Sequence, residues 1–366
     1  MLIAIDANEA NIEKRVGVNQ FSFELLKNIY EIRKNNNQYQ NLSFRIFLSF
    51  SPLPDFPPPT NWWQYEVFGP KKFWTWTGLV KRLYLGQPRP DILFSPSHYG
   101  PAFSPIPFVI SIMDLGFLRW PEQFTKKDYF QLKYWTKRSV KKAAKIITIS
   151  EFSKKDIAAT YGVDINKISV IYPGVYTDKI KIKSKQDKDY FIYVGTLKPS
   201  KNIKRLIRAF NKLDKKDLKL MIVGKKGWLY EDIFKLVRKL KLQERIVFTG
   251  FVTEKEKQQL IANAQALVLP SLWEGFGIPV LEAMAVGTLV VCSQVASLPE
   301  VADKAAIYID NPENIDSIVQ ALNKVLKLNT DKKKKIIEDG FRQLKKFSWK
   351  TAAELLLGEL IRSYGR

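Results

Sequence analysis

Short apolar segments alternate with longer amphipathic segments along the whole chain of 366 residues. The apolar segments have the length and the bounding turn residues that are typical of buried strands. They fall at residues 2–6, 44–50, 92–95, 108–112 and 146–150 in the first half, and at 191–194, 219–223, 246–248, 266–269, 289–292 and 306–309 in the second. The pattern therefore predicts two consecutive sets of strands.

The segments between these strands carry apolar residues three and four positions apart, which predicts helices. They cover residues 19–34, 126–145, 202–213, 230–241, 254–263, 279–285, 314–328 and 349–364. Alternating strands and helices predict an α/β protein with doubly wound parallel sheets. In such sheets ligands bind at the carboxyl ends of the strands, where loops lead into helices.

The length of the chain is typical of two domains. Residues 176–188 crowd Asp, Lys, Ser and Gln together without periodicity, which favours a linker. We therefore predict an N-terminal Rossmann-like domain at 1–178 and a second Rossmann-like domain at 179–345. The helical pattern at 349–364 falls in a C-terminal segment, 346–366.

The composition, 46% hydrophobic and 26% charged, is that of a globular protein. One cysteine, Cys292, excludes an internal disulfide framework, and one histidine, His98, excludes a zinc cluster of His and Cys within one chain. No apolar run is long enough to cross a membrane. Residues 1–6 have the pattern of a strand, not of a signal peptide. We therefore expect a soluble cytoplasmic protein.

Lys and Arg number 59 against 36 Asp and Glu, which gives a formal charge of +23. Such a surface suits nucleic acid, anionic lipid or phosphorylated ligands, and a solvated lysine-rich surface explains it equally well. The sequence has no recognisable nucleic-acid-binding element. We therefore do not expect a nucleic acid partner.

The segment that points most directly to chemistry covers residues 270–285 and begins at the end of a predicted strand. Gly275 and Gly277 allow backbone amides to approach a ligand, and the following helix would direct its N-terminus at a phosphate. Glu274 precedes that helix and Glu282 lies about one turn into it. Carboxylates accept hydrogen bonds from vicinal hydroxyls, so the segment suits a sugar nucleotide.

This segment resembles the signature of the retaining glycosyltransferases of family 4 (GT4, or glycosyltransferase group 1), in which two glutamates are eight positions apart. The resemblance covers nearly the whole chain, and further segments carry it: 114–122, 149–156, 172–175 and 193–202. It implies the GT-B fold, in which two Rossmann-like domains face a cleft. It also implies that the last helix, within 346–366, crosses back to the N-terminal domain.

The resemblance implies a role for each matching residue. Glu282 would bind the ribose of a nucleotide-sugar donor, and Lys201 would neutralise its diphosphate. Glu274 would hold the sugar hydroxyls together with the amides of Gly275, Phe276 and Gly277. The remaining donor-site residues would be Gly17, Thr196, Lys198, Gly224, Gly250 and Val252.

Two positions depart from the family pattern. Thr196 and Ser200 stand where the family usually has an arginine, and Lys198 is a candidate for the missing charge. Met113 precedes Asp114 where the family has a histidine, and methionine cannot hydrogen-bond a sugar as imidazole does. Asp114 remains a candidate to orient the acceptor, and His98 is either a structural residue or a replacement from a neighbouring loop.

The resemblance implies transfer with retention, in which the leaving diphosphate accepts the proton of the attacking hydroxyl. Such a site needs positive charge and positioning more than a strong base. Among catalytic residues we expect Glu274, Lys201 and Asp114. The predicted cleft loops contain no acidic metal-binding pattern, so we expect no metal and no cofactor beyond a GDP- or UDP-hexose co-substrate.

Aromatic and basic residues crowd together at 61–76, where Trp62 and Trp63 are candidates for acceptor contacts. Aromatic rings beside cations suit a membrane interface or a glycan or lipid-linked acceptor, and packing beneath proline-rich loops is the other interpretation. An anionic membrane surface is therefore a further expected partner, with the protein on the inner face of the cell membrane.

We predict a transferase that moves a mannose- or glucose-type hexose in the synthesis of a cell-surface polysaccharide. The alternative is a catalytically impaired nucleotide-sugar-binding or scaffold protein of the same fold, which Met113 and Ser200 motivate. An epimerase or a phosphorylase explains the Glu274–Glu282 segment less well.

Overall fold

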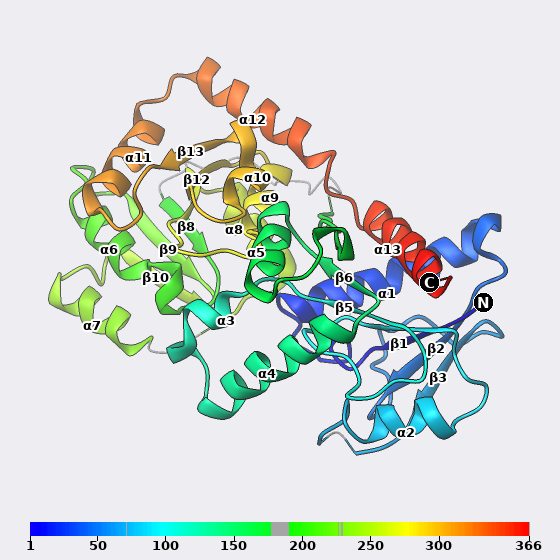
Figure 1. Ribbon diagram of the computed structural model, residues 1–366. Coiled ribbons are helices and arrows are strands. Elements are labelled where there is room, and N and C mark those ends of the chain that lie inside the picture. Colours follow the sequence, from blue (N-terminus) through cyan, green and yellow to red (C-terminus); the bar gives the residue numbers. More distant parts are fainter. Residues whose placement is uncertain (71, 177–189, 226, 228–229, 366) are drawn as a thin grey trace. The chain divides into compact units, whose positions relative to one another are not determined.

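A computed structural model describes residues 1–70, 72–176, 190–225, 227 and 230–365 (Figure 1). The chain forms two compact units. Unit 1 comprises Met1–Leu118, Lys126–Gly174 and Phe347–Arg366, and unit 2 comprises Arg119–Thr125 and Val175–Lys346. The predicted boundary between residues 178 and 179 lies outside the described residues.

Unit 1 is built on a parallel sheet of seven strands in the order β3-β2-β1-β4-β5-β6-β7. The central strands are almost wholly buried, as strands that are covered on both faces must be. The strands are β1 (Leu2–Asp6), β2 (Ser43–Leu48), β3 (Trp63–Val67), β4 (Ile92–Ser95), β5 (Phe108–Ser111), β6 (Lys145–Thr148) and β7 (Ile168–Val170).

The helices of unit 1 are α1 (Val18–Asn35), α2 (Gly78–Leu85), α4 (Lys126–Lys142), α5 (Glu151–Tyr161) and α13 (Trp349–Tyr364); the short α3 (Gly116–Arg119) ends at the unit boundary. The C-terminal helix α13 lies beside α1, as the red and blue ribbons of Figure 1 show. The Phe21 and Trp349 rings meet at 6.0 Å in this contact. The last helix thus completes the core of the first unit.

Unit 2 is built on a parallel sheet of six strands in the order β10-β9-β8-β11-β12-β13. Its strands are β8 (Tyr190–Val194), β9 (Lys219–Val223), β10 (Ile246–Gly250), β11 (Ala266–Leu269), β12 (Leu289–Ser293) and β13 (Ala306–Ile309). Its helices are α6 (Ile203–Asn211), α7 (Glu231–Lys239), α8 (Glu254–Ala262), α9 (Ile278–Ala285), α10 (Leu298–Ala302), α11 (Ile315–Lys327) and α12 (Thr330–Leu344).

All the predicted strands and helices are present, with ends that differ by a few residues. The helix predicted at 126–145 ends at Lys142, because Lys145 already belongs to β6. The sequence pattern missed β3, β7, α2, α3, α5, α10 and α12. β3 lies at the edge of its sheet with mixed burial, so it lacks the continuous apolar pattern of a central strand.

None of the helices in the described ranges combines the length and the apolar character that a bilayer span requires.

Candidate functional site

The carboxyl edge of the sheet in unit 2 is shaped by two glycines that let neighbouring strands approach. Gly195 follows β8 and Gly224 follows β9, and a Cβ on Gly224 would lie 2.0 Å from the Gly195 carbonyl oxygen. The Gly195 amide donates to the Val223 carbonyl at 2.9 Å, and the Gly224 amide donates to the Gly250 carbonyl at 2.9 Å. Three predicted donor-site segments therefore lie next to one another.

The other predicted donor-site residues of this edge lie in the same loops. Thr196 and Lys198 are half-buried after β8, and the Thr196 carbonyl accepts a hydrogen bond of 3.3 Å from the Tyr193 hydroxyl. Val252 is half-buried after β10. The loop after β8 is fixed to the loop after β9, because the Leu197 amide donates to the Lys225 carbonyl at 3.0 Å.

Lys201 and Glu274 form an ion pair at this edge. Lys201 ends a short 3-10 turn after β8, and its Nζ lies 2.5 Å from Glu274 Oε1. The two side chains are only 16% and 10% exposed. The Ser271 hydroxyl donates to the same carboxylate oxygen at 2.8 Å. The structure thus joins two residues that the sequence analysis assigned to different parts of one ligand.

Asn202 fixes the backbone that carries Lys201. Its side-chain amide donates to the carbonyls of Pro270 and Pro312, at 3.0 and 2.6 Å. The Leu272 amide donates to the Ser200 carbonyl at 2.8 Å. The loops that follow β8 and β11 are therefore held together by buried hydrogen bonds, independently of the ion pair.

The glycine-rich segment leads into α9 as the sequence predicted. Gly277 is the N-cap residue with φ 100°, and a Cβ there would lie 2.7 Å from Leu298 Cδ2. Phe276 is buried, and the Ser297 hydroxyl donates to the carbonyls of Glu274 and Phe276. Gly275 lies between them and is half-buried. Gly277, the N-cap residue of α9, therefore lies three positions after Glu274 in the chain.

Glu282 lies in the second turn of α9 and pairs with a residue that the sequence analysis did not consider. Its Oε1 lies 2.7 Å from Lys257 Nζ of α8, whereas its Oε2 is buried without a hydrogen-bond partner in the described part of the chain. Burial raises the pKa of Glu282; Lys257 opposes this shift and Glu254 adds to it.

Sequence reasoning missed several residues of this edge, namely Ser271, Ser297, Lys257, Arg119 and Gln123. The Arg119 guanidinium lies 4.2 Å from the centre of the Trp273 ring. The side-chain carbonyl oxygen of Gln123 accepts a hydrogen bond of 3.2 Å from Ser200. Ser271 and Trp273 stand inside the signature segment, and Arg119 stands inside segment 114–122, so their positions in these segments were the available signal. Nothing in the sequence indicates the contacts of Ser297, Lys257 and Gln123.

The candidates of unit 1 gather at the carboxyl edge of its own sheet. Gly17 is the N-cap residue of α1. Asp114 follows β5 and accepts a hydrogen bond of 2.6 Å from the Gly116 amide. His98 follows β4, and its ring meets Phe117 at 5.7 Å. Burial lowers the pKa of His98, and the nearby Asp114 carboxylate opposes this shift. Met113 is buried beside them.

The aromatic cluster at 61–76 is largely internal, which favours the second of the two interpretations, packing beneath the proline-rich loops. Trp63 is fully buried in β3, and its Nε1 donates to the Tyr65 hydroxyl at 3.1 Å. Trp62 is half-buried against the Tyr30 ring, with centres 4.9 Å apart. Trp74 is buried, and its Nε1 donates to Asp6. Trp76 alone of these four tryptophans is markedly exposed, at 37%.

Two carboxyl groups that the sequence did not single out lie at the end of β1: Asp6, its buried last residue, and Glu9, which is half-buried in the loop that follows. Burial raises the pKa of Asp6. Burial and the Asp6 charge raise the pKa of Glu9 to about 7, although Asn19 donates to its carboxylate at 2.8 Å. We therefore expect Glu9 to keep its proton to a higher pH than an exposed glutamate does.

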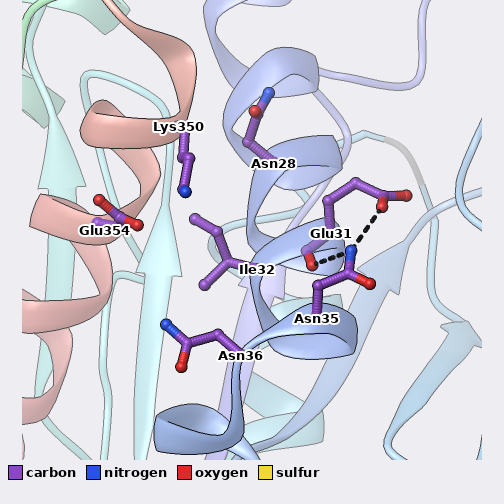
Figure 2. A pocket seen from close by; sticks show the side chains of 7 residues that line it. All are labelled: Asn28, Glu31, Ile32, Asn35, Asn36, Lys350 and Glu354. Carbon is purple, nitrogen blue, oxygen red and sulfur yellow. Dashed lines mark hydrogen bonds between the residues drawn. The ribbon is translucent and has the colours of Figure 1, made fainter.

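A polar cavity of about 370 Å³ lies between α1 and α13. Figure 2 shows the residues that line it: Asn28, Glu31, Ile32, Asn35, Asn36, Lys350 and Glu354. They belong to the C-terminal half of α1, which runs back from the carboxyl edge of the sheet, and to the start of α13. The cavity therefore lies away from the edge at which parallel sheets bind ligands.

Comparisons with known families agree with the architecture. The family described as "Glycosyl transferases group 1" matches residues 176–343, and "Glycosyltransferase Family 4" matches residues 49–179. Together the two matches extend over both units. The chain belongs to the family 4, or group 1, glycosyltransferases, and its fold is GT-B.

Two similar relatives are named as mannosyltransferases. The O-antigen chain mannosyltransferase RfbU of Salmonella typhimurium is 35% identical over 60% of this chain and 61% of its own. The O-antigen chain mannosyltransferase B of Escherichia coli is 30% identical over 66% of each chain. The chain thus aligns with less than two thirds of the length of these relatives.

A solved structure resembles the chain over nearly its full length. The sucrose-phosphate synthase of Thermosynechococcus elongatus superimposes with a TM-score of 0.74, covering 99% of this chain and 98% of its own, at 17% identity. At this identity the likeness concerns the fold alone.

Proposed function

We propose that the protein transfers a hexose from a nucleotide sugar to a glycan or lipid-linked acceptor in the synthesis of a cell-surface polysaccharide. The observation that carries the proposal is the buried Lys201–Glu274 pair beside the N-terminus of α9. A cation next to the N-terminus of a helix suits a diphosphate, and a carboxylate beside it suits sugar hydroxyls. The names of the two O-antigen relatives favour mannose, and hence GDP-mannose as the donor.

In this proposal different residues of unit 2 bind different parts of the donor. Gly195 and Gly224 let the loops after β8 and β9 approach each other, and Gly250 has open space beside it for the nucleotide at the carboxyl edge. Glu282 accepts hydrogen bonds from the ribose through the Oε2 atom that the described residues leave unbonded. Lys201 neutralises the diphosphate, and Glu274 holds the hexose with the amides of residues 275–277.

We further propose that the transfer retains the anomeric configuration and needs no metal ion. The hydroxyl oxygen of the acceptor bonds to the anomeric carbon while the bond to the diphosphate oxygen breaks, and that oxygen takes the hydroxyl proton. Lys201 and the α9 amides would supply the positive charge that the leaving group requires. Asp114, with His98 close to it, would orient the acceptor from unit 1.

Thermal stability with a panel of nucleotide sugars tests the donor site, because a ligand of the folded state raises the unfolding midpoint. One donor should raise the midpoint of the wild type and not that of Glu282→Ala. Glu244→Ala, an exposed glutamate before β10, is the matched control and should respond as the wild type does. A donor that stabilises both variants equally would refute the assignment of Glu282.

Turnover separates the enzyme from the alternative of an impaired binding protein. Ser200 is buried and donates to Gln123, so it cannot replace the arginine of the family pattern. The enzyme should release nucleoside diphosphate when the stabilising donor meets a lipid-linked glycan acceptor. Donor binding without transfer to any acceptor would favour the scaffold.

We also propose that the protein acts on the cytoplasmic side of the cell membrane and touches it through α4. Only Thr136, Ser139 and Val140 of this helix are buried. The opposite face exposes Phe130 and Tyr134, whose ring centres lie 4.4 Å apart. Exposed lysines surround them, at positions 126, 127, 133, 137 and 141. Rings flanked by cations suit the interface of an anionic bilayer.

Flotation with vesicles of phosphatidylglycerol and phosphatidylcholine tests the membrane surface. Binding should fall with salt, and should be lost in Phe130→Ser with Tyr134→Ser. Phe341→Ser, an exposed aromatic of α12, is the control for the rings. Lys137→Glu with Lys141→Glu tests the cations of α4. Lys334→Glu with Lys335→Glu, which makes the same change of charge in α12, is its control. Equal binding of all variants would refute the role of α4 and leave the transferase proposal unaffected.

A further inference from the structure

Lys257 bridges two carboxylates at the end of the predicted donor site. Its Nζ lies 2.7 Å from Glu282 Oε1 and 2.8 Å from Glu254 Oε2. The Lys257 side chain is 19% exposed and that of Glu282 is 12% exposed, whereas Glu254 is 65% exposed. The bond to Glu282 is therefore the shielded one of the two.

The helix that carries Lys257 is fixed at its start. Thr253 caps α8, because its hydroxyl accepts from the Glu256 amide and the Glu256 carboxylate accepts from the Thr253 amide. This capping box sets the position of the first turns of α8. Lys257 thus approaches α9 from a rigid element, and its ammonium group has a defined place.

The ion pair leaves the two oxygens of Glu282 in different situations. Oε1 is held by Lys257, whereas Oε2 is buried and meets no hydrogen-bond partner among the described residues. A buried carboxylate oxygen is costly to leave unbonded, so a ligand hydroxyl that reaches Oε2 gains a strong hydrogen bond. The pair thereby occupies one oxygen of Glu282 and leaves the other without a bond among the described residues.

We infer that Lys257 is a positioning residue of the donor site, which holds Oε1 of Glu282 and thereby leaves its Oε2 for the ribose hydroxyls of the nucleotide. This inference rests on the proposed function of Glu282 and adds a residue to it. Lys257 does not touch the reacting atoms, so it acts on donor affinity and not on the transfer step.

The charges around Glu282 predict the pH dependence of donor binding. Burial raises the pKa of Glu282, Lys257 lowers it and Glu254 raises it. The pKa of Lys257 is itself raised, because the two carboxylates outweigh the effect of burial, so the ammonium stays charged. The ionised carboxylate binds the ribose, and binding is therefore lost as the pH falls through the pKa of Glu282. Without Lys257 this loss moves to higher pH, and without Glu254 it moves to lower pH.

The experiment is calorimetric titration of the full-length protein with GDP and with UDP, across the pH range in which the protein stays folded. Lys257→Met should weaken binding of the nucleotide about tenfold and move the acidic loss of binding to higher pH. Glu254→Gln should move it to lower pH. Lys257→Arg, which keeps the charge, should restore most of the affinity.

The outcomes separate this inference from the proposed function. Suppose that Lys257→Met keeps the affinity and the pH profile of the wild type while Glu282→Ala abolishes binding. This result would refute the role of Lys257 and would still support the donor site. Glu282→Ala that binds normally would refute the donor site itself. If Lys257→Met does not fold, the opposite shift in Glu254→Gln and the recovery in Lys257→Arg still decide the question.

Discussion

Lys201 and Glu274 meet at 2.5 Å between Nζ and Oε1, although 73 positions separate them in the chain. The Glu274 charge also reaches Tyr193, whose pKa is raised by burial and by this carboxylate. The pair therefore joins two roles: it neutralises a buried acid in the free protein, and it presents a cation and a carboxylate to the proposed donor.

Replacing Lys201 by Met should both abolish transfer and destabilise unit 2. The change leaves Glu274 as a buried carboxylate without its cation, which typically costs about 3–5 kcal/mol. Urea unfolding measures the loss of stability, and release of nucleoside diphosphate measures transfer. The double variant Lys201→Met with Glu274→Gln should recover much of the stability but no activity. Recovery of activity in it would contradict a role for the two charges in catalysis.

Gly224→Ala should distort the donor edge, because the new Cβ would lie 2.0 Å from the Gly195 carbonyl oxygen. We expect a loss of about 3 kcal/mol or more and weaker nucleotide binding. Gly250→Ala is the control: it meets no atom within 4 Å, so only its positive φ of 73° is strained. That variant should lose about 1 kcal/mol. Equal unfolding free energies of the two variants, measured in urea, would contradict the close approach of the loops.

Replacing Asn202 by Gly or by Asp should destabilise the protein. Glycine relieves the positive φ of 60° but removes both amide hydrogen bonds to the carbonyls of Pro270 and Pro312. We expect a loss of about 2 kcal/mol from these two bonds. An aspartate at this position would direct carboxylate oxygens at the two carbonyls, so Asn202→Asp should cost more. Thermal unfolding at neutral pH measures both, and a stable Asn202→Asp variant would contradict the observed contacts.

Glu9→Gln should change how stability depends on pH. The pKa of Glu9 is raised from 4.5 to about 7 by burial and by Asp6, so the folded state holds a proton that the unfolded state has already lost. The stability from this group is complete below pH 4.5 and is lost as the pH rises through about 7. The variant keeps the bond from Asn19 and should gain about 3 kcal/mol above neutral pH, and nothing in acid. Urea unfolding as a function of pH checks this; parallel profiles of wild type and variant would contradict it.

The sequence determined the fold class and the main segment of the site through local patterns. Buried parallel strands are continuous apolar runs, so β1, β9 and β11 could be located to the residue. The positions of Gly277 and Pro279 in the sequence predicted the first residue of α9 with an error of one residue. The edge strand β3 and the short helices were not predicted, because mixed burial and short length weaken the periodic pattern of apolar residues.

Only the tertiary structure decided which charges meet. The alternating charges at the start of α8 look like a solvated helix face, and nothing local distinguishes Lys257 from the lysine two positions before it. Trp63 and Trp76 are equally apolar in the sequence, yet one is fully buried and the other is 37% exposed. Partners such as Lys201 and Glu274 come together because parallel strands return the chain repeatedly to the same edge of a sheet. That return depends on the order of the strands, which no local pattern contains.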